Sequence, residues 1–187
     1  MLRGELTGAI LLLDPTFDVS TQPVGPAPAD IDVKAQVHAF VLNEARLLDK
    51  RRWEEWLSLW SDDGRYWMPR HHEQDSPLDQ VSLFYEDRML RETRVRRLTN
   101  PRNWSQQPIT HSSRLIGNVE IDGVDRQGAV IVRSVLNYTE YRLEQQTLAG
   151  EVFHKLARNE QGQWKLLLKR IDLVNCDAVF NNLEVFV

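Results

Sequence analysis

The sequence predicts an α+β protein in which helices come first and a strongly curved antiparallel or mixed sheet follows. Apolar residues recur at helical spacing between residues 33 and 60. From residue 109 onward, apolar and polar residues alternate over four long stretches, which is typical of strands. Turn residues separate these stretches, so short hairpin-like links should join the strands into an antiparallel meander.

The first 29 residues form an arm of different composition. Four prolines and a glycine favour extended or irregular backbone and stop helix propagation there: Pro15, Pro23, Gly25, Pro26 and Pro28. Such an arm can be disordered or can pack on a partner chain, and the sequence leaves both open. We expect an irregular arm over residues 1–29 and a single α+β domain over residues 30–187, a size that suits one domain.

Two helices are expected after the arm. The first begins near Asp30 or Asp32, because either carboxylate can accept the free N–H groups of a first helical turn. Its apolar positions follow helical spacing: Val33, Val37, Phe40, Val41 and Leu48. The second, Lys50–Trp60, places Trp53, Trp56 and Trp60 on one face, which is typical of core packing. Asp62-Asp63-Gly64 is predicted to be a turn.

The rest of the chain is predicted to be mainly strands. Two short strands, an arginine-rich helix and a loop come first: Arg65–Met68, Gln80–Phe84, Asp87–Leu98 and Asn100–Pro108. Four long strands follow: Ile109–Ile121, Ala129–Leu143, Glu151–Arg158 and Trp164–Val174. Turns are expected at Asp122-Gly123, at 147–150 and at 160–162. Inward residues such as Val130, Val132 and Leu136 should face the helices or a subunit interface.

Composition narrows the class of protein. The net charge is −4, with 27 acidic and 23 basic side chains, which argues against a nucleic-acid binder. Cys176 is the only cysteine, so no internal disulfide can form and a reducing cytoplasm is the expected compartment. The apolar run at residues 9–13 is far shorter than the ~20 residues that span a bilayer, so we expect a soluble protein without a membrane segment.

The chain lacks the ligands of two common protein iron centres. A Rieske cluster takes two cysteines and two histidines, and one cysteine cannot supply them. A mononuclear iron site takes two histidines and a carboxylate on one face. The histidines show no helical or alternating spacing that would build such a site: His38, His71, His72, His111 and His154. We expect no metal-ligating, cofactor-binding or catalytic residue in this chain.

Three weaker signals have a structural and a functional interpretation. Polar residues inside a covered, curved sheet can perform acid–base chemistry, and the candidates are Asp63, Tyr66, Tyr85, His111 and Asp172. Each is more often a satisfied structural residue. Six arginines resemble an anion-binding patch, but neighbouring acids favour local ion pairs or a protein interface: Arg88, Arg91, Arg94, Arg96, Arg97 and Arg102. Cys176 has no local signature of a nucleophile.

Several segments in order resemble the small (beta) subunit of aromatic-ring-hydroxylating (Rieske non-haem iron) dioxygenases. They are 44–49, 53–57, 63–69, 81–88, 94–98, Trp104, Pro108, 113–119 and 164–173. The resemblance covers about residues 33–180, and the order and spacing of these segments are what make it specific. The N-terminal arm is not matched.

The resemblance implies a cone-shaped roll like that of ketosteroid isomerase and nuclear transport factor proteins. It also implies a homotrimer that supports three large (alpha) subunits in an α3β3 complex. Those large subunits would hold the Rieske 2Fe–2S cluster and the mononuclear iron and would dihydroxylate an aromatic compound in a degradation pathway. The isolated small subunit would not be catalytic. The alternative is a stand-alone pocket enzyme on the same roll, of the isomerase, dehydratase or epoxide hydrolase type.

Overall fold

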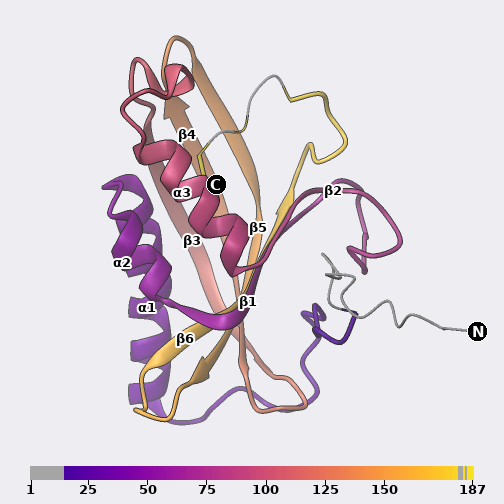
Figure 1. Cartoon of the computed structure of the whole chain (residues 1–187). Coiled ribbons are helices and arrows are strands. Elements are labelled where there is room, and N and C mark those ends of the chain that lie inside the picture. Colours follow the sequence, from indigo (N-terminus) through magenta and orange to yellow (C-terminus); the bar gives the residue numbers. More distant parts are fainter. Residues whose placement is uncertain (1–14, 181–182, 184) are drawn as a thin grey trace, which may run out of the picture.

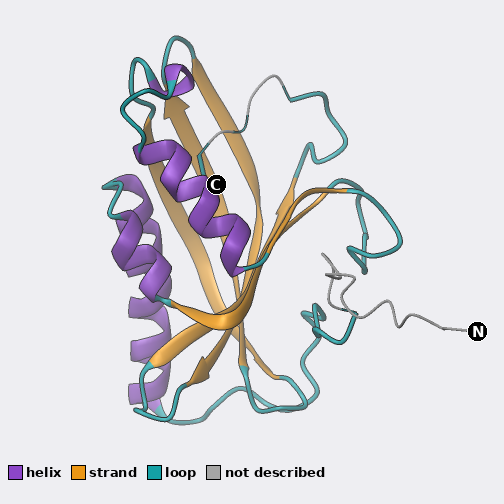
Figure 2. Ribbon diagram, in the orientation of Figure 1, coloured by secondary structure: helices purple, strands orange, loops and turns teal. Residues whose placement is uncertain are grey.

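A six-stranded mixed sheet with three α-helices on one of its faces makes up most of this computed structural model, which describes residues 15–180, 183 and 185–187 (Figures 1 and 2). The strands are β1 (Trp60–Pro69), β2 (Ser82–Glu86), β3 (His111–Val124), β4 (Val130–Tyr141), β5 (Gln145–Arg158) and β6 (Trp164–Leu173). Their order across the sheet is β2-β1-β6-β5-β4-β3. Only β1 and β6 pair in parallel among these neighbours, so the sheet is mixed.

The helices begin where short carboxylates cap them. Helix α1 (Ile31–Asp49) follows Asp30, whose side chain accepts a hydrogen bond from the Asp32 N–H at 2.8 Å, so the first of the two predicted caps is confirmed. Helix α3 (Arg88–Thr99) is capped in the same way by Asp87. Helix α2 (Trp53–Ser58) is shorter than predicted, because Trp60 already belongs to β1.

The core lies between the helices and the inner face of the sheet. Trp53, Trp56 and Trp60 are buried there, as their spacing predicts. Val132 and Leu136 of β4 belong to the same core, so the inward positions face the helices, one of the two predicted alternatives. Phe186 closes the core, with its ring centroid 4.3 Å from that of Trp56.

Three predicted turns are wrong because their glycines lie inside strands. Gly64 is in β1, Gly123 in β3 and Gly150 in β5. A Cβ on Gly150 would lie 2.5 Å from the backbone oxygen of Asp172, so this glycine permits close approach of two strands. The links between β3, β4 and β5 are at residues 125–129 and 142–144 instead. The turn predicted at residues 160–162 is confirmed, and Gly162 has a φ of +76°.

The described part of the arm packs on the chain's own sheet. Gly25 forms a bridge with Val124, and the Lys155 ammonium lies 2.9 Å from the carboxylate of Asp18. His154 points toward the helices, so Lys155 points to the opposite face, and the arm covers part of that face. Residues 1–14, with the apolar run at 9–13, lie outside the described residues. The helices in the described ranges are all too short or too polar to cross a membrane.

Candidate functional site

A cluster of charged side chains lies in the core, between helix α1 and the inner face of the sheet. It consists of Glu44 on α1, His154 on β5 and Lys169 on β6, each 2% exposed or less. The Lys169 ammonium donates to both carboxylate oxygens of Glu44, at 3.0 and 3.1 Å. The indole N–H of Trp56 donates to the same carboxylate at 2.6 Å. His154 Nε2 lies 3.8 Å from Glu44 Oε2.

The register of the sheet brings this cluster together. Lys169 pairs with Tyr66 of β1 on one side and with His154 of β5 on the other, so the three side chains form a row across the inner face. A bulge at Leu167 of β6, where Lys155 and Leu156 pair with Leu168 and Leu166, shifts the alternation so that Leu166 and Lys169 both point inward. Sequence reasoning missed Glu44, His154 and Lys169, because no short-range spacing links them.

Burial and charge pull the pKa values of the cluster in opposite directions. Burial on its own would raise the pKa of Glu44, but Lys169, His154 and Trp56 outweigh it and hold that pKa well below its usual range. Burial lowers the pKa of His154, and the nearby Glu44 opposes this only in part. Burial also lowers the pKa of Lys169, and the Glu44 carboxylate opposes that shift. The lowered pKa values of Glu44 and His154 favour an ionised carboxylate beside a neutral imidazole.

Residues 185–187 seal the cluster from solvent. The Lys169 ammonium donates to the backbone oxygen of Val187 at 3.1 Å, and the Val187 N–H donates to the Tyr66 hydroxyl at 3.2 Å. The guanidinium of Arg114 donates to the backbone oxygen of Phe186 and to the carboxylate of Asp49 at the end of α1. A substrate cannot reach Glu44, His154 or Lys169 while these residues occupy the interior.

The five acid–base candidates are not brought together. Tyr66 is buried beneath Val187, and burial raises the pKa of its hydroxyl far above the usual range. Asp63 and His111 are exposed at different places, on β1 and at the start of β3. Asp172 accepts two hydrogen bonds from the guanidinium Nε of Arg170, and Tyr85 packs edge-on against Trp67. The geometry therefore favours a structural role for these five residues over a role in acid–base chemistry.

The arginine-rich helix is part of the fold. Arg91 is buried, donates to the backbone oxygens of Gly64 and Glu86 at 2.6 and 3.0 Å, and stacks 4.0 Å above Trp60. Arg94 stacks 3.8 Å from the Phe84 ring and pairs with Glu86. Arg88 pairs with two acids at the surface, whereas Arg96, Arg97 and Arg102 are exposed. Local ion pairs were predicted, but the burial of Arg91 was not.

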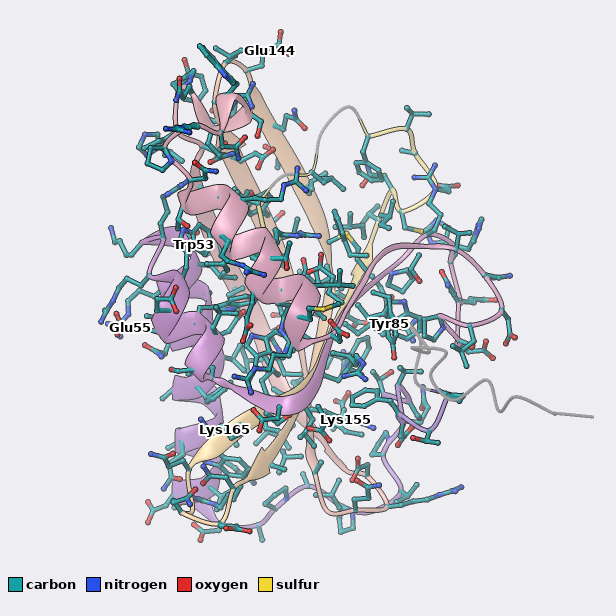
Figure 3. All side chains as sticks on the ribbon, viewed as in Figure 1. Trp53, Glu55, Tyr85, Glu144, Lys155 and Lys165 are labelled. Carbon is teal, nitrogen blue, oxygen red and sulfur yellow. The ribbon has the colours of Figure 1, made fainter. Side chains whose placement is uncertain are left out.

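An apolar surface lies at the end of the molecule where the β4–β5 hairpin meets the loop after α3; Glu144 marks this tip in Figure 3. We call it the apical patch, and it consists of Trp104, Ile109, Tyr141 and Leu143. Each side chain is at least half exposed, and Trp104 reaches 83%. The Arg142 guanidinium donates to the backbone oxygen of Ser105 and holds the two loops together. Exposed apolar side chains gathered in this way are typical of a protein interface.

Comparisons with known proteins agree with a subunit role. The family model described as "Ring hydroxylating beta subunit" matches residues 43–178. The chain is 31% identical over 172 residues to the benzene 1,2-dioxygenase subunit beta of Pseudomonas putida, covering 86% of this chain and 92% of the relative. It is 35% identical to the 2-halobenzoate 1,2-dioxygenase small subunit of Burkholderia cepacia, covering 80% of this chain and 93% of the relative.

A solved structure shows the same architecture. The beta subunit of the benzoate 1,2-dioxygenase from Burkholderia mallei superimposes with a TM-score of 0.64 at 28% identity. The match covers 81% of this chain and 95% of that one. The predicted α+β roll is therefore confirmed.

Proposed function

The chain belongs to the family of ring-hydroxylating beta subunits, and from this membership we propose that it is the structural small subunit of an aromatic-ring-hydroxylating dioxygenase. The observation that carries the proposal is the family match over residues 43–178. The sealed interior supports it, because the acid–base groups of the core have no access to a substrate. The chain would act as a component of an oxidoreductase and would not be catalytic on its own.

The partner implied by this role is a large (alpha) subunit. The residues of this chain do not fit a Rieske cluster, since one cysteine cannot supply its two thiolates. The 2Fe–2S cluster and the mononuclear iron would therefore belong to the large subunit, as would the choice of aromatic substrate. We propose a homotrimer of this chain within an α3β3 complex, located in the cytoplasm and free of nucleic acid.

Co-expression tests this proposal. With an affinity tag on a candidate large subunit alone, this chain is expected to co-purify in equal amounts and to run at the size of a hexamer. Iron should remain with the large subunit when the two chains are separated. A chain that never binds an iron-containing partner, and that converts a small molecule by itself, would support the stand-alone pocket enzyme instead.

The stand-alone enzyme is the weaker candidate. Such an enzyme needs convergent titratable groups in an open cavity. Here the convergent groups, Glu44, His154 and Lys169, lie beneath residues 185–187. Of the five acid–base candidates, Tyr66 is buried beneath Val187, Asp63 and His111 are exposed on different strands, and Asp172 is paired with Arg170.

A further inference from the structure

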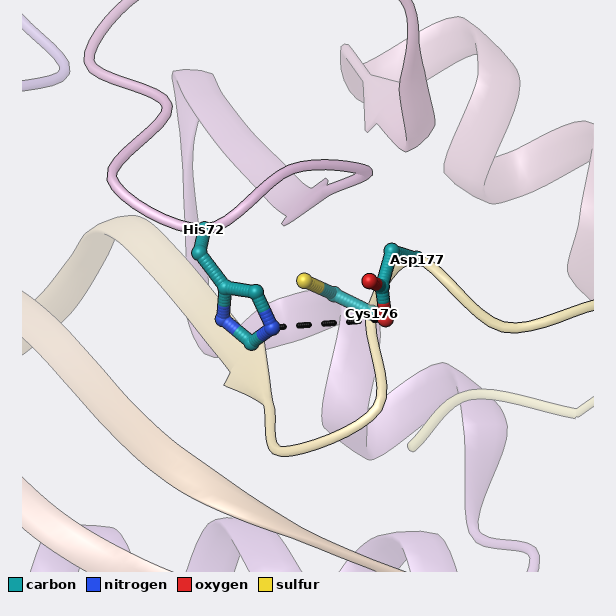
Figure 4. A group of neighbouring side chains, drawn as sticks. All are labelled: His72, Cys176 and Asp177. Carbon is teal, nitrogen blue, oxygen red and sulfur yellow. Dashed lines mark ion pairs between the residues drawn. The ribbon is translucent and has the colours of Figure 1, made fainter.

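Two loops bring an exposed imidazole, a buried thiol and an exposed carboxylate together. His72 lies in the loop after β1, and Cys176 and Asp177 lie in the turn after β6. Figure 4 shows the imidazole and the thiol facing each other, with the carboxylate of Asp177 beside them. One ligand atom from each residue lies within 4.8 Å of the other two, and His72 Nε2 is 4.0 Å from Asp177 Oδ1.

Hydrogen bonds fix both loops in place. The backbone N–H of Arg70 donates to the side-chain oxygen of Gln74 at 2.9 Å, and the buried amide of Gln74 donates to the backbone of the segment before β2. The Cys176 N–H donates to the backbone oxygen of Leu173 at 3.2 Å. The Arg70 guanidinium also donates to the backbone oxygen of Ala178 at 2.7 Å, which joins the two loops. The three donors are thus held close together by contacts outside the group.

The charges around the thiol are mainly negative. Burial raises the pKa of the Cys176 thiol, and the carboxylates of Asp177 and Asp172 raise it further. Cys176 itself is buried, whereas His72 and Asp177 are both more than 60% exposed at their side chains. A divalent cation would relieve the repulsion between carboxylate and thiolate, because it takes the place of the thiol proton.

We propose that His72, Cys176 and Asp177 bind a divalent transition-metal ion of the Zn²⁺ class, with water in the fourth position. Zinc takes thiolate, imidazole and carboxylate ligands in a tetrahedron, in which the ligand atoms lie about 3.4–3.6 Å apart. The donors must therefore approach by about an ångström. Rotation of the exposed His72 and Asp177 side chains allows this. A thiolate ligand does not suit Mg²⁺ or Ca²⁺. The bound ion would clip the loop after β1 to the turn after β6.

Metal titration of the full chain tests the site. One equivalent of Zn²⁺ is expected to bind, and Co²⁺ is expected to give the near-ultraviolet charge-transfer absorption of a cobalt thiolate. The Cys176→Ser and His72→Gln variants should bind at least ten times more weakly, and Cys176→Ser should lose the absorption. The matched controls are His71→Gln, next to His72, and Asp75→Asn, a nearby exposed acid; both should bind as the unmodified chain does.

Zinc should also raise the melting temperature of the unmodified chain and of both controls, but not that of His72→Gln. Because the thiol gives up its proton, binding should strengthen as the pH rises. The proposal is overturned if Co²⁺ produces no thiolate band, or if His72→Gln binds zinc as tightly as His71→Gln does. Circular dichroism before metal addition checks that each variant folds. If the Cys176→Ser variant does not fold, because its side chain is buried, the His72→Gln variant still decides the test.

Discussion

The Lys169 ammonium lies 3.0 Å from Oε1 of Glu44, so an ion pair that water does not reach joins strand β6 to helix α1. Buried pairs of this kind contribute little when compared with apolar residues, but removing one partner leaves the other charge stranded. Replacing only one of the two residues should therefore cost more stability than replacing both with apolar residues.

The Lys169→Met variant is expected to be strongly destabilised. Glu44 would remain buried without its cation, which costs about 3–5 kcal/mol of unfolding free energy. Urea unfolding measures this loss. Lys165→Met, on the same strand, removes an ammonium that donates to the backbone oxygen of Ser58 at the surface and should change stability by no more than about 0.5 kcal/mol. Equal losses in the two variants would contradict the importance of the pair.

Lowering the pH is expected to destabilise the chain through His154. Burial between Glu44 and Lys169 holds the pKa of His154 below its ordinary value of 6.5. The unfolded chain then binds a proton that the folded chain does not, so the free energy of unfolding falls as the pH drops below 6.5. Urea unfolding between about pH 7.5 and pH 5 should show this slope.

The His154→Gln variant provides the control for that slope. Glutamine does not titrate, so its stability should vary less with pH over the same range, whatever its absolute value. The pKa of Glu44 is held well below its ordinary value of 4.5, so the loss due to Glu44 begins only in more acidic solution. A slope unchanged by His154→Gln would mean that another group titrates.

Phe186→Ala is expected to open the core. The ring contacts Trp53, Trp56 and Tyr66, and its removal should cost about 3–5 kcal/mol, as for other buried aromatic residues. Val174→Ala, at a side chain that is 72% exposed, is the comparison and should be nearly neutral. Thermal unfolding of both variants measures the difference. A small loss for Phe186→Ala would mean that residues 185–187 contribute little to the sealed interior.

Two strand glycines should respond oppositely to alanine. Gly150→Ala places a Cβ 2.5 Å from the backbone oxygen of Asp172 and is expected to cost about 1–3 kcal/mol, because β5 and β6 must move apart. Gly117→Ala in β3 meets nothing within 4 Å and should be neutral or stabilising by up to about 1 kcal/mol. Urea midpoints decide between them, and similar effects at both positions would refute the role given to close approach.

The apical patch is expected to contact the large subunit. The double variant Trp104→Ser, Leu143→Ser should reduce co-purification with a tagged large subunit at least tenfold while the chain still folds, since apolar anchors dominate interface energies. Val179→Ser is the control, because Val179 is 89% exposed on a different loop. If the double variant breaks the contact between copies of this chain instead, the patch belongs to the trimer.

Local chemistry predicted much of the fold. The N-cap at Asp30, the buried tryptophans and the alternation of β4 each depend on residues near in sequence, and each is found where expected. The wrongly predicted turns lie where contacts between strands far apart in the sequence determine the local structure. Gly64 and Gly150 have the composition of turns, yet their hydrogen atoms face the backbones of Leu166 and Asp172.

The buried cluster lay beyond the reach of sequence reasoning for the same reason. Glu44, His154 and Lys169 come from a helix and two strands: the register of β5 on β6 pairs His154 with Lys169, and helix α1 places Glu44 beside both. A lysine among the inward leucines of the last strand was the one available signal. His72 and Cys176 likewise meet only through the fold, which local spacing cannot reveal.

The parallel pairing of β1 with β6 bears on how the chain folds during synthesis. Tyr66 and Trp67 emerge from the ribosome long before Lys169 and Arg170, the residues with which they pair. Until then β1 presents an open edge, which is where nascent chains associate wrongly. Folding should therefore complete only after the last strand is released, and chains truncated before β6 should depend on chaperones or aggregate.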